Sequence, residues 1–243
     1  MIGNDKIVTL CGSEGYVLRS VRPEEGEACA EIEQICFPPN EACSPRHMRE
    51  RVSGAPELFL VAEDKTTGEI AGFLNGIATD EEQFRDEFFT DVSLHRESGK
   101  NVMLLGLDVL PEHRKKGLAR ALLEEYAARE KRKGRKRLVL TCLEEKVPMY
   151  RHLGLRDLGA SASVWGGEAW HEMDLVLWRY KSDLQERRNK ASFGEKLRRF
   201  SSEFFTRRQL YDIIIHRNCG KAAPCPGGCP ISVFIILRKG IFL

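Results

Sequence analysis

The sequence has no long apolar segment and no sign of a secretory signal. Its longest uncharged apolar stretch runs only from Ile231 to Leu237, whereas a helix that crosses a bilayer needs about 20 such residues. The first twenty residues contain no basic head followed by an apolar block. Since 42% of the 243 residues are hydrophobic, the chain can still bury a core, and we expect a folded protein of the cytoplasm.

Several other patterns are missing. No internal repeat is visible, which argues against a solenoid. The eight cysteines have no regular spacing, so we expect reduced thiols and not a disulfide framework. Neither GxxxxGKS/T nor GxGxxG occurs, which argues against an NTPase or a dinucleotide-dependent enzyme.

Charge is distributed unevenly along the chain, although the formal net charge is only +2. Residues 1–178 hold 24 Lys and Arg against 31 Asp and Glu, whereas residues 179–243 hold 14 against 5. An acidic body favours a cationic small substrate, because charge of one sign raises the local concentration of its counter-ion. The basic end is either a solvated extension or a contact with an anionic surface or partner, and nothing in it predicts a specific nucleic acid.

Hydrophobic periodicity predicts a mixed α/β fold with one central sheet flanked by helices. We expect this domain at 16–178, between an N-terminal extension (1–15) and a basic C-terminal extension (179–243). The expected strands are 16–21, 58–62, 70–77, 102–109 and 137–142, with a final hairpin formed by 155–164 and 169–177. The expected helices are 24–36, 45–52, 117–134 and 147–153, and residues 80–101 are expected to be a mobile excursion.

The segment from Leu104 to Ala119 carries a signal for phosphate binding. It runs from a nearly all-apolar strand through a turn at Pro111 into a helix that Gly117 opens. The amides at the start of that helix have no intrahelical partner and lie at the positive end of its dipole, so they suit a pyrophosphate. Positive charge is added by Arg114, Lys115, Lys116 and Arg120.

Further motifs accompany Arg114-x-x-Gly117-x-Ala119. They are Phe37-Pro-Pro-Asn-Glu41, residues 93–100, Leu107-Asp-Val-Leu-Pro111, Val147-Pro-Met-Tyr150 and residues 167–173. In this order, over about residues 16–177, the motifs resemble the GNAT superfamily of acyl-CoA N-acyltransferases. The resemblance is to its arylalkylamine (serotonin-type) and fungal polyamine acetyltransferase branch in particular.

The resemblance implies an enzyme that uses acetyl-CoA, needs no metal, and acetylates the primary amine of a small arylalkylamine or polyamine. Direct attack of the amine in a ternary complex is the implied mechanism. The resemblance further implies that Leu107, Asp108 and Val109 offer backbone groups to the pantetheine arm. The residues implied to hold the pyrophosphate are Arg114, Lys115, Lys116, Gly117, Leu118, Ala119 and Arg120.

Tyr150 matches the family tyrosine near the sulfur of CoA, and a phenol with a pKa of about 10 can protonate a leaving thiolate. Two strand histidines of the vertebrate serotonin enzymes correspond here to Met103 and Leu105, neither of which accepts a proton. Glu41 resembles the glutamate of insect dopamine acetyltransferases and is expected to be the base or the amine anchor. A relay through water is equally compatible with a carboxylate of ordinary pKa.

Phe37 and His95 are expected to line the amine pocket. Two other functions stay open. One is acetylation of a protein lysine or N-terminus, and the other is an acyl-CoA-binding regulator without turnover, which the missing histidines suggest. In the basic extension, a zinc site is not expected, because the spacing of its candidate ligands matches no common form: His216, Cys219, Cys225 and Cys229.

Overall fold

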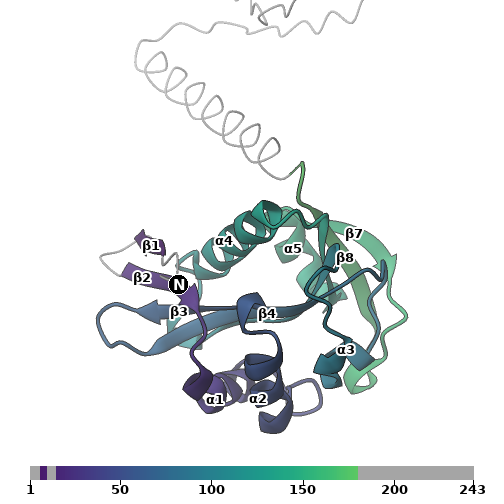
Figure 1. The fold of residues 1–243 in the computed structure, drawn as a ribbon. Helices are drawn as coiled ribbons and strands as arrows, with labels where there is room; N and C mark the ends of the chain where they lie inside the picture. The colour runs from purple at the N-terminus through teal and green to yellow at the C-terminus, as the bar shows by residue number, and fades with distance from the viewer. Residues whose placement is uncertain (1–5, 10–14, 180–243) are drawn as a thin grey trace, which may run out of the picture. The chain divides into compact units, whose positions relative to one another are not determined.

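An eight-stranded sheet runs through the part of the chain that the computed structural model describes, residues 6–9 and 15–179 (Figure 1). The strands follow the order β1-β2-β3-β4-β5-β6-β8-β7, and only β5 and β6 pair in parallel. The predicted fold class is thereby confirmed. The strand bounds are β1 Lys6–Thr9, β2 Gly15–Ser20, β3 Phe59–Asp64, β4 Ile70–Thr79, β5 Asn101–Val109, β6 Arg137–Leu143, β7 Arg156–Ala160 and β8 Trp170–Val176.

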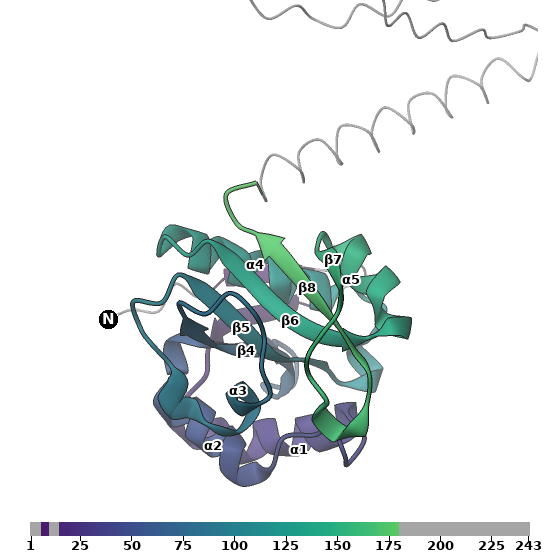
Figure 2. The ribbon, with the colours of Figure 1, turned by 90° about the vertical axis from the view of Figure 1, so that its right-hand side faces the viewer.

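Helices cover both faces of the sheet (Figures 1 and 2). Helices α1 and α2 lie on one face, and α4 lies on the other. The helix bounds are α1 Gly26–Cys36, α2 Pro45–Gly54, α3 Glu87–Thr90, α4 Leu118–Arg132 and α5 Val147–Leu153. Local chemistry sets one boundary plainly, since Ser44 Oγ accepts the His47 N–H at 3.2 Å and Pro45 occupies the first helical position of α2.

Two apolar cores fill the space between the layers. The larger core joins the sheet to α4 through side chains such as Leu74, Leu122 and Tyr126. The smaller core joins the sheet to α1 and α2 through Met48, Phe59 and others. Both faces of β4 and β5 are therefore buried, which explains why their sequences are nearly all apolar.

Strands β5 and β6 separate along their length. Only three residue pairs join them, Asn101 to Arg137, Val102 to Leu138 and Met103 to Val139, although both strands continue beyond these pairs. Strand β5 also bulges, because Asn75 pairs with Gly106 while Gly76 pairs with Leu104. The second halves of β5 and β6 consequently diverge and leave an opening in the sheet.

Some expectations from the sequence need correction. Residues 80–101 are packed and not a mobile excursion, because they form α3 and bury Phe84 and Phe88. The last hairpin is shorter than expected, with a 3-10 turn (Trp165–Gly167) between its strands. The sheet also gains β1 inside the expected N-terminal extension, where Ile7 pairs with Val17.

The expectations for residues 180–243, including the zinc ligands considered above, lie outside the described residues. The four cysteines that the structure describes, Cys29, Cys36, Cys43 and Cys142, are free thiols as expected. Among the described helices, none is long and apolar enough to cross a membrane.

Candidate active site

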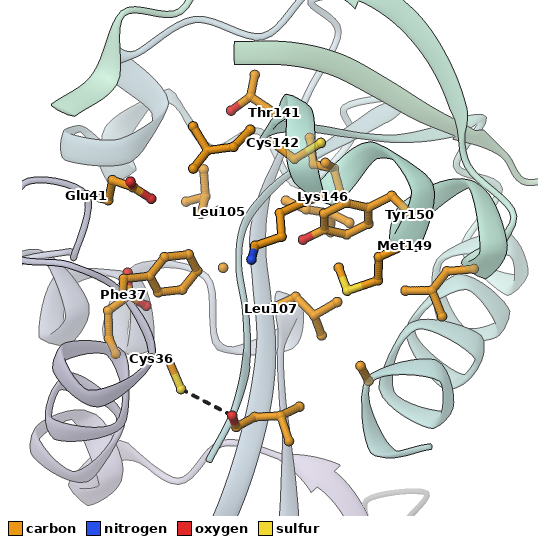
Figure 3. Close-up of a pocket in the computed structure, with 18 of the residues that line it drawn as sticks. Cys36, Phe37, Glu41, Leu105, Leu107, Thr141, Cys142, Lys146, Met149 and Tyr150 are labelled. Carbon is orange, nitrogen blue, oxygen red and sulfur yellow. Dashed lines mark hydrogen bonds between the residues drawn. The ribbon is translucent and has the colours of Figure 1, made fainter. Parts of the chain in front are cut away.

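A cavity of about 820 Å³ occupies the opening between β5 and β6. Its wall includes β5 from Leu104 to Leu107 and β6 from Leu140 to Leu143. Loops after α1 and before α4, together with α5, close its sides (Figure 3). The volume is within the range of ordinary small-molecule sites, which is roughly 300 to 1000 Å³.

One end of the cavity is formed by the loop before α4 together with the first turn of that helix, residues 114–120, called here the phosphate loop. Gly117 has a φ of 93°, a left-handed conformation that a side chain would disfavour, although a Cβ there would meet no atom within 4 Å. Lys115 is also left-handed, with a φ of 61°. Arg114 Nε donates to the Val109 carbonyl at 2.8 Å and so fixes the loop to the end of β5.

The first amides of α4 face no intrahelical acceptor and lie at the positive end of a helix of fifteen residues. The loop residues that line the cavity are Arg114, Lys115, Gly117, Leu118, Ala119 and Arg120. This arrangement can bind an anionic group such as a pyrophosphate at one end of the cavity.

The opposite end is lined by aromatic side chains, Phe37, Phe89, Trp165 and Trp170, called here the aromatic wall. The rings of Phe89 and Trp165 lie 4.9 Å apart between centroids. Trp165 Nε1 donates to the Glu41 carbonyl at 2.8 Å, and Trp170 Nε1 donates to the Trp165 carbonyl at 2.9 Å. Hydrogen bonds thus hold the loop after α1 and the turn before β8 together around this end.

Glu41 lines the cavity beside the aromatic wall (Figure 3). Partial burial raises the pKa of its carboxyl group, and the charges of Glu168 and Glu145 raise it further, while Lys146 opposes them. Lys146 is itself paired with Glu145 at 2.8 Å. Glu41 can therefore bind a cationic group at neutral pH, at a place where several charges already influence its own ionisation.

Tyr150 comes from α5, and its ring is drawn on the side of the cavity opposite Phe37 and Glu41 (Figure 3). Burial raises the pKa of the phenol, and the negative charges of Cys142 and Asp108, when ionised, raise it further. The hydroxyl group stays protonated at neutral pH and can donate a proton or a hydrogen bond. Cys142 is a poor nucleophile, because burial raises the pKa of its thiol to about 12.

The structure brings most of the predicted site residues to one cavity, namely Phe37, Glu41, Leu107, Val109, Tyr150 and most of the phosphate loop. Asp108 and Lys116 are not among the lining residues. The Asp108 side chain is fully buried. Any contact of this residue with a ligand is therefore left to its backbone.

His95 does not line the cavity, contrary to expectation. Its Nδ1 accepts the Ala78 N–H at 3.1 Å, and its Nε2 lies 3.0 Å from Glu57 Oε1. The imidazole thus satisfies a backbone donor near the end of β4. Sequence spacing could not show this, because the partners lie 17 and 38 residues away.

Other lining residues were not predicted. Phe89, Trp165, Thr141 and Arg51 reach the cavity from four separate segments. The Oγ1 atom of Thr141 is buried without a hydrogen-bond partner in the described chain, and its side chain is drawn at the cavity (Figure 3). No local pattern marks these positions.

The family model described as "Acetyltransferase (GNAT) family" matches residues 26–155, more than half of the sequence. The chain therefore belongs to the GNAT acetyltransferase family. No curated protein shows significant similarity to the sequence.

Solved structures share the fold at low sequence identity. The loading GNATL domain of CurA from Lyngbya majuscula is 17% identical, with a TM-score of 0.58 over 68% of this chain and 98% of that domain. The GphF GNAT-like decarboxylase in complex with isobutyryl-CoA is 21% identical, with a TM-score of 0.55 over 66% of this chain and 98% of that protein. Ard1 from Thermoplasma volcanium is 14% identical, with a TM-score of 0.50 over 66% of this chain and 97% of that protein. At these identities the likeness concerns the fold alone.

Proposed function

We propose that the protein transfers the acetyl group of acetyl-CoA to the primary amine of a small arylalkylamine or polyamine. The main support is a single cavity that has the phosphate loop at one end and Glu41 with the aromatic wall at the other. An acyl-CoA spans such a cavity with its pyrophosphate at the loop and its thioester between the diverging strands. The amine enters from the side of Glu41.

The wall chemistry favours an aromatic amine over an aliphatic polyamine. Trp165 and Phe89 offer large apolar faces next to a carboxylate, which suits a flat ring with an ammonium group on a short chain. The acidic composition of residues 1–178 also favours a cationic substrate.

The steps that follow deprotonation of the ammonium each have a candidate group. The ammonium loses a proton, and its nitrogen attacks the thioester carbonyl carbon. The oxyanion accepts a hydrogen bond from a main-chain N–H of β5, near Leu107 or Val109. Collapse breaks the carbon–sulfur bond, and Tyr150 protonates the thiolate.

Thiol release from acetyl-CoA tests this function, with serotonin, tyramine, spermidine, lysine and a histone-tail peptide as acceptors. Amine-dependent release with serotonin or tyramine, larger than with spermidine, is the expected result. Release only with the peptide would show that the acceptor is a protein. Binding of acetyl-CoA without release for any amine would identify a non-catalytic binding protein and overturn the proposal.

A further inference from the structure

Four buried polar side chains gather beside the cavity and have no part in the transfer as described so far. They are Glu33 of α1, Arg51 of α2, Asn75 of β4 and Asp108 of β5, with exposures of 3, 4, 1 and 0%. Burying two carboxyl groups together costs free energy, because each loses its hydration. Such groups near a cavity are candidates for a chemical role.

The hydrogen bonds of this cluster are incomplete. Glu33 Oε1 accepts the Cys43 N–H at 3.0 Å, and Arg51 Nη2 donates to the Phe89 carbonyl at 2.9 Å. Glu33 Oε2 and both carboxyl oxygens of Asp108 are buried without a partner in the described chain. Cys36 lies nearby, but its thiol donates to the Val109 carbonyl at 3.4 Å (Figure 3).

Gly106 places the two carboxyl groups next to the cavity. This residue lines the cavity at the bulge of β5, and a Cβ there would lie 2.9 Å from Asp108 Oδ2 and 3.3 Å from Glu33 Oε2. Glu33 and Arg51 line the cavity themselves. A side chain at position 106 would therefore collide with both carboxyl groups, and the glycine leaves room for them beside the cavity.

Two carboxyl groups buried this close together influence each other's ionisation. Burial raises the pKa of Glu33, and burial together with the charge of Glu33 raises the pKa of Asp108 well above its ordinary value. Arg51 lowers both. Three kinds of other ionisable group face the pair. Arg114 lowers the pKa of Asp108. The thiols of Cys29, Cys36 and Cys43 are kept neutral by burial, and the phenol of Tyr150 is kept neutral in the same way.

We propose that Glu33, sharing its proton with Asp108, is the proton acceptor that frees the amine for attack. The inference rests on the proposed acetyl transfer and names a residue that the motifs left open. Met103 is fully buried and Leu105 is apolar, so neither histidine position supplies a base. Glu41 then anchors the ammonium, and a second carboxyl group receives its proton.

The protons balance as follows in this scheme. Above the pH of the ascending limb both carboxyl groups are ionised, and Glu33 takes one proton from the bound ammonium, which it then shares with Asp108. This leaves a neutral amine. The nitrogen forms its bond to the carbonyl carbon, and the carbon–sulfur bond breaks. Tyr150 gives its proton to the thiolate and regains one from the new amide nitrogen. The pair then releases its proton to solvent.

The test compares pH profiles of kcat/KM for Asp108→Asn and Glu33→Gln with the wild-type profile. We expect Asp108→Asn to lower kcat/KM about 100-fold. Its ascending limb should move to lower pH, because Glu33 no longer has a neighbouring carboxylate that opposes its ionisation. Glu33→Gln should lose that limb, and both variants should bind acetyl-CoA with the wild-type Kd.

A matched control is Asp174→Asn. Asp174 is also fully buried, on β8, but it is paired with Arg156 at 2.6 Å and does not line the cavity. This variant should lose thermal stability, but the ascending limb of its kcat/KM profile should lie at the same pH as in the wild type. Infrared spectroscopy supplies a readout without turnover at a pH below the wild-type limb and above the limb expected for Asp108→Asn. The band of a buried protonated carboxyl should be present there in the wild type, disappear in Asp108→Asn and persist in Asp174→Asn.

The outcomes separate the two proposals. A wild-type enzyme that is active with amines, and whose limb is unmoved in both cluster variants, overturns the acceptor role alone. Lower activity with an unmoved limb also overturns it, because a purely structural role predicts that result. A wild-type protein that releases no thiol with any amine overturns the acetyl transfer, and the acceptor role with it.

Discussion

The two ends of the cavity differ in how the chain builds them. The phosphate loop is one continuous segment, residues 114–120, and its last three residues are the first turn of α4. The aromatic wall comes from three segments far apart in sequence, carrying Phe37, Phe89 and the pair Trp165 and Trp170. A site that depends on backbone amides can be local, whereas a shaped apolar surface has to be assembled from several elements.

We expect the largest effect, a loss of affinity for acetyl-CoA, from a substitution in the phosphate loop. Gly117→Glu forces a residue with a side chain into a left-handed conformation and adds a carboxylate where we propose that the phosphates bind, which together cost about 4 kcal/mol or more. We expect the Kd of acetyl-CoA, measured by isothermal titration calorimetry, to rise about 1000-fold. Gly134→Ala is the control, since Gly134 is also left-handed, with a φ of 83°, but lies beyond the other end of α4. It should lower stability and leave the Kd unchanged.

The second largest effect, on kcat, is expected from a residue that lies between the two ends of the cavity. Tyr150→Phe removes the hydroxyl that we propose protonates the thiolate, so kcat should fall about 100-fold while the Kd of acetyl-CoA is kept. Steady-state kinetics with a saturating amine measures this. The control is Tyr126→Phe, which loses a buried hydrogen bond to the Leu58 carbonyl (3.0 Å) and should reduce stability without affecting kcat. Unchanged turnover in Tyr150→Phe would remove this residue from the mechanism.

Glu41→Gln tests the carboxylate beside the aromatic wall. Loss of an ionic hydrogen bond to the ammonium should raise the KM of the amine about tenfold. Because the pKa of Glu41 is raised, the wild-type KM should increase as pH falls, beginning above the pH at which an ordinary glutamate becomes protonated. In Glu41→Gln this increase should be absent. Glu31→Gln, at an exposed position of α1, should match the wild type.

The smallest effect, on the preference between two amines, is expected from a substitution in the aromatic wall. Trp165→Leu removes one aromatic face and its hydrogen bond to the Glu41 carbonyl. We expect the ratio of kcat/KM for tyramine to that for spermidine to fall about fivefold, through loss of an aromatic pair contact. Trp178→Leu is the control, because Trp178 is 67% exposed and lies outside the cavity lining. An unchanged ratio in Trp165→Leu would remove the aromatic wall from substrate selection.

Most of the fold could be predicted because its signals are local. The apolar run of β5, the cap at Ser44 and the glycine before α4 each depend on neighbours within a few residues. The packing of residues 80–101 was missed, because Phe84 and Phe88 belong to a core whose other members come from many distant segments. His95 was misplaced for the same reason, since its partners Ala78 and Glu57 are distant in sequence.

The sequence by itself determined the family, the mixed sheet and the position of the phosphate loop, because backbone conformation and helix termini follow from short-range chemistry. Only the tertiary structure decided where β5 leaves β6, which rings face Glu41, and that Glu33 and Asp108 meet behind Gly106. The physical reason is that burial and the electrostatic interaction of two carboxyl groups depend on distances between elements, and no spacing along the chain sets those distances.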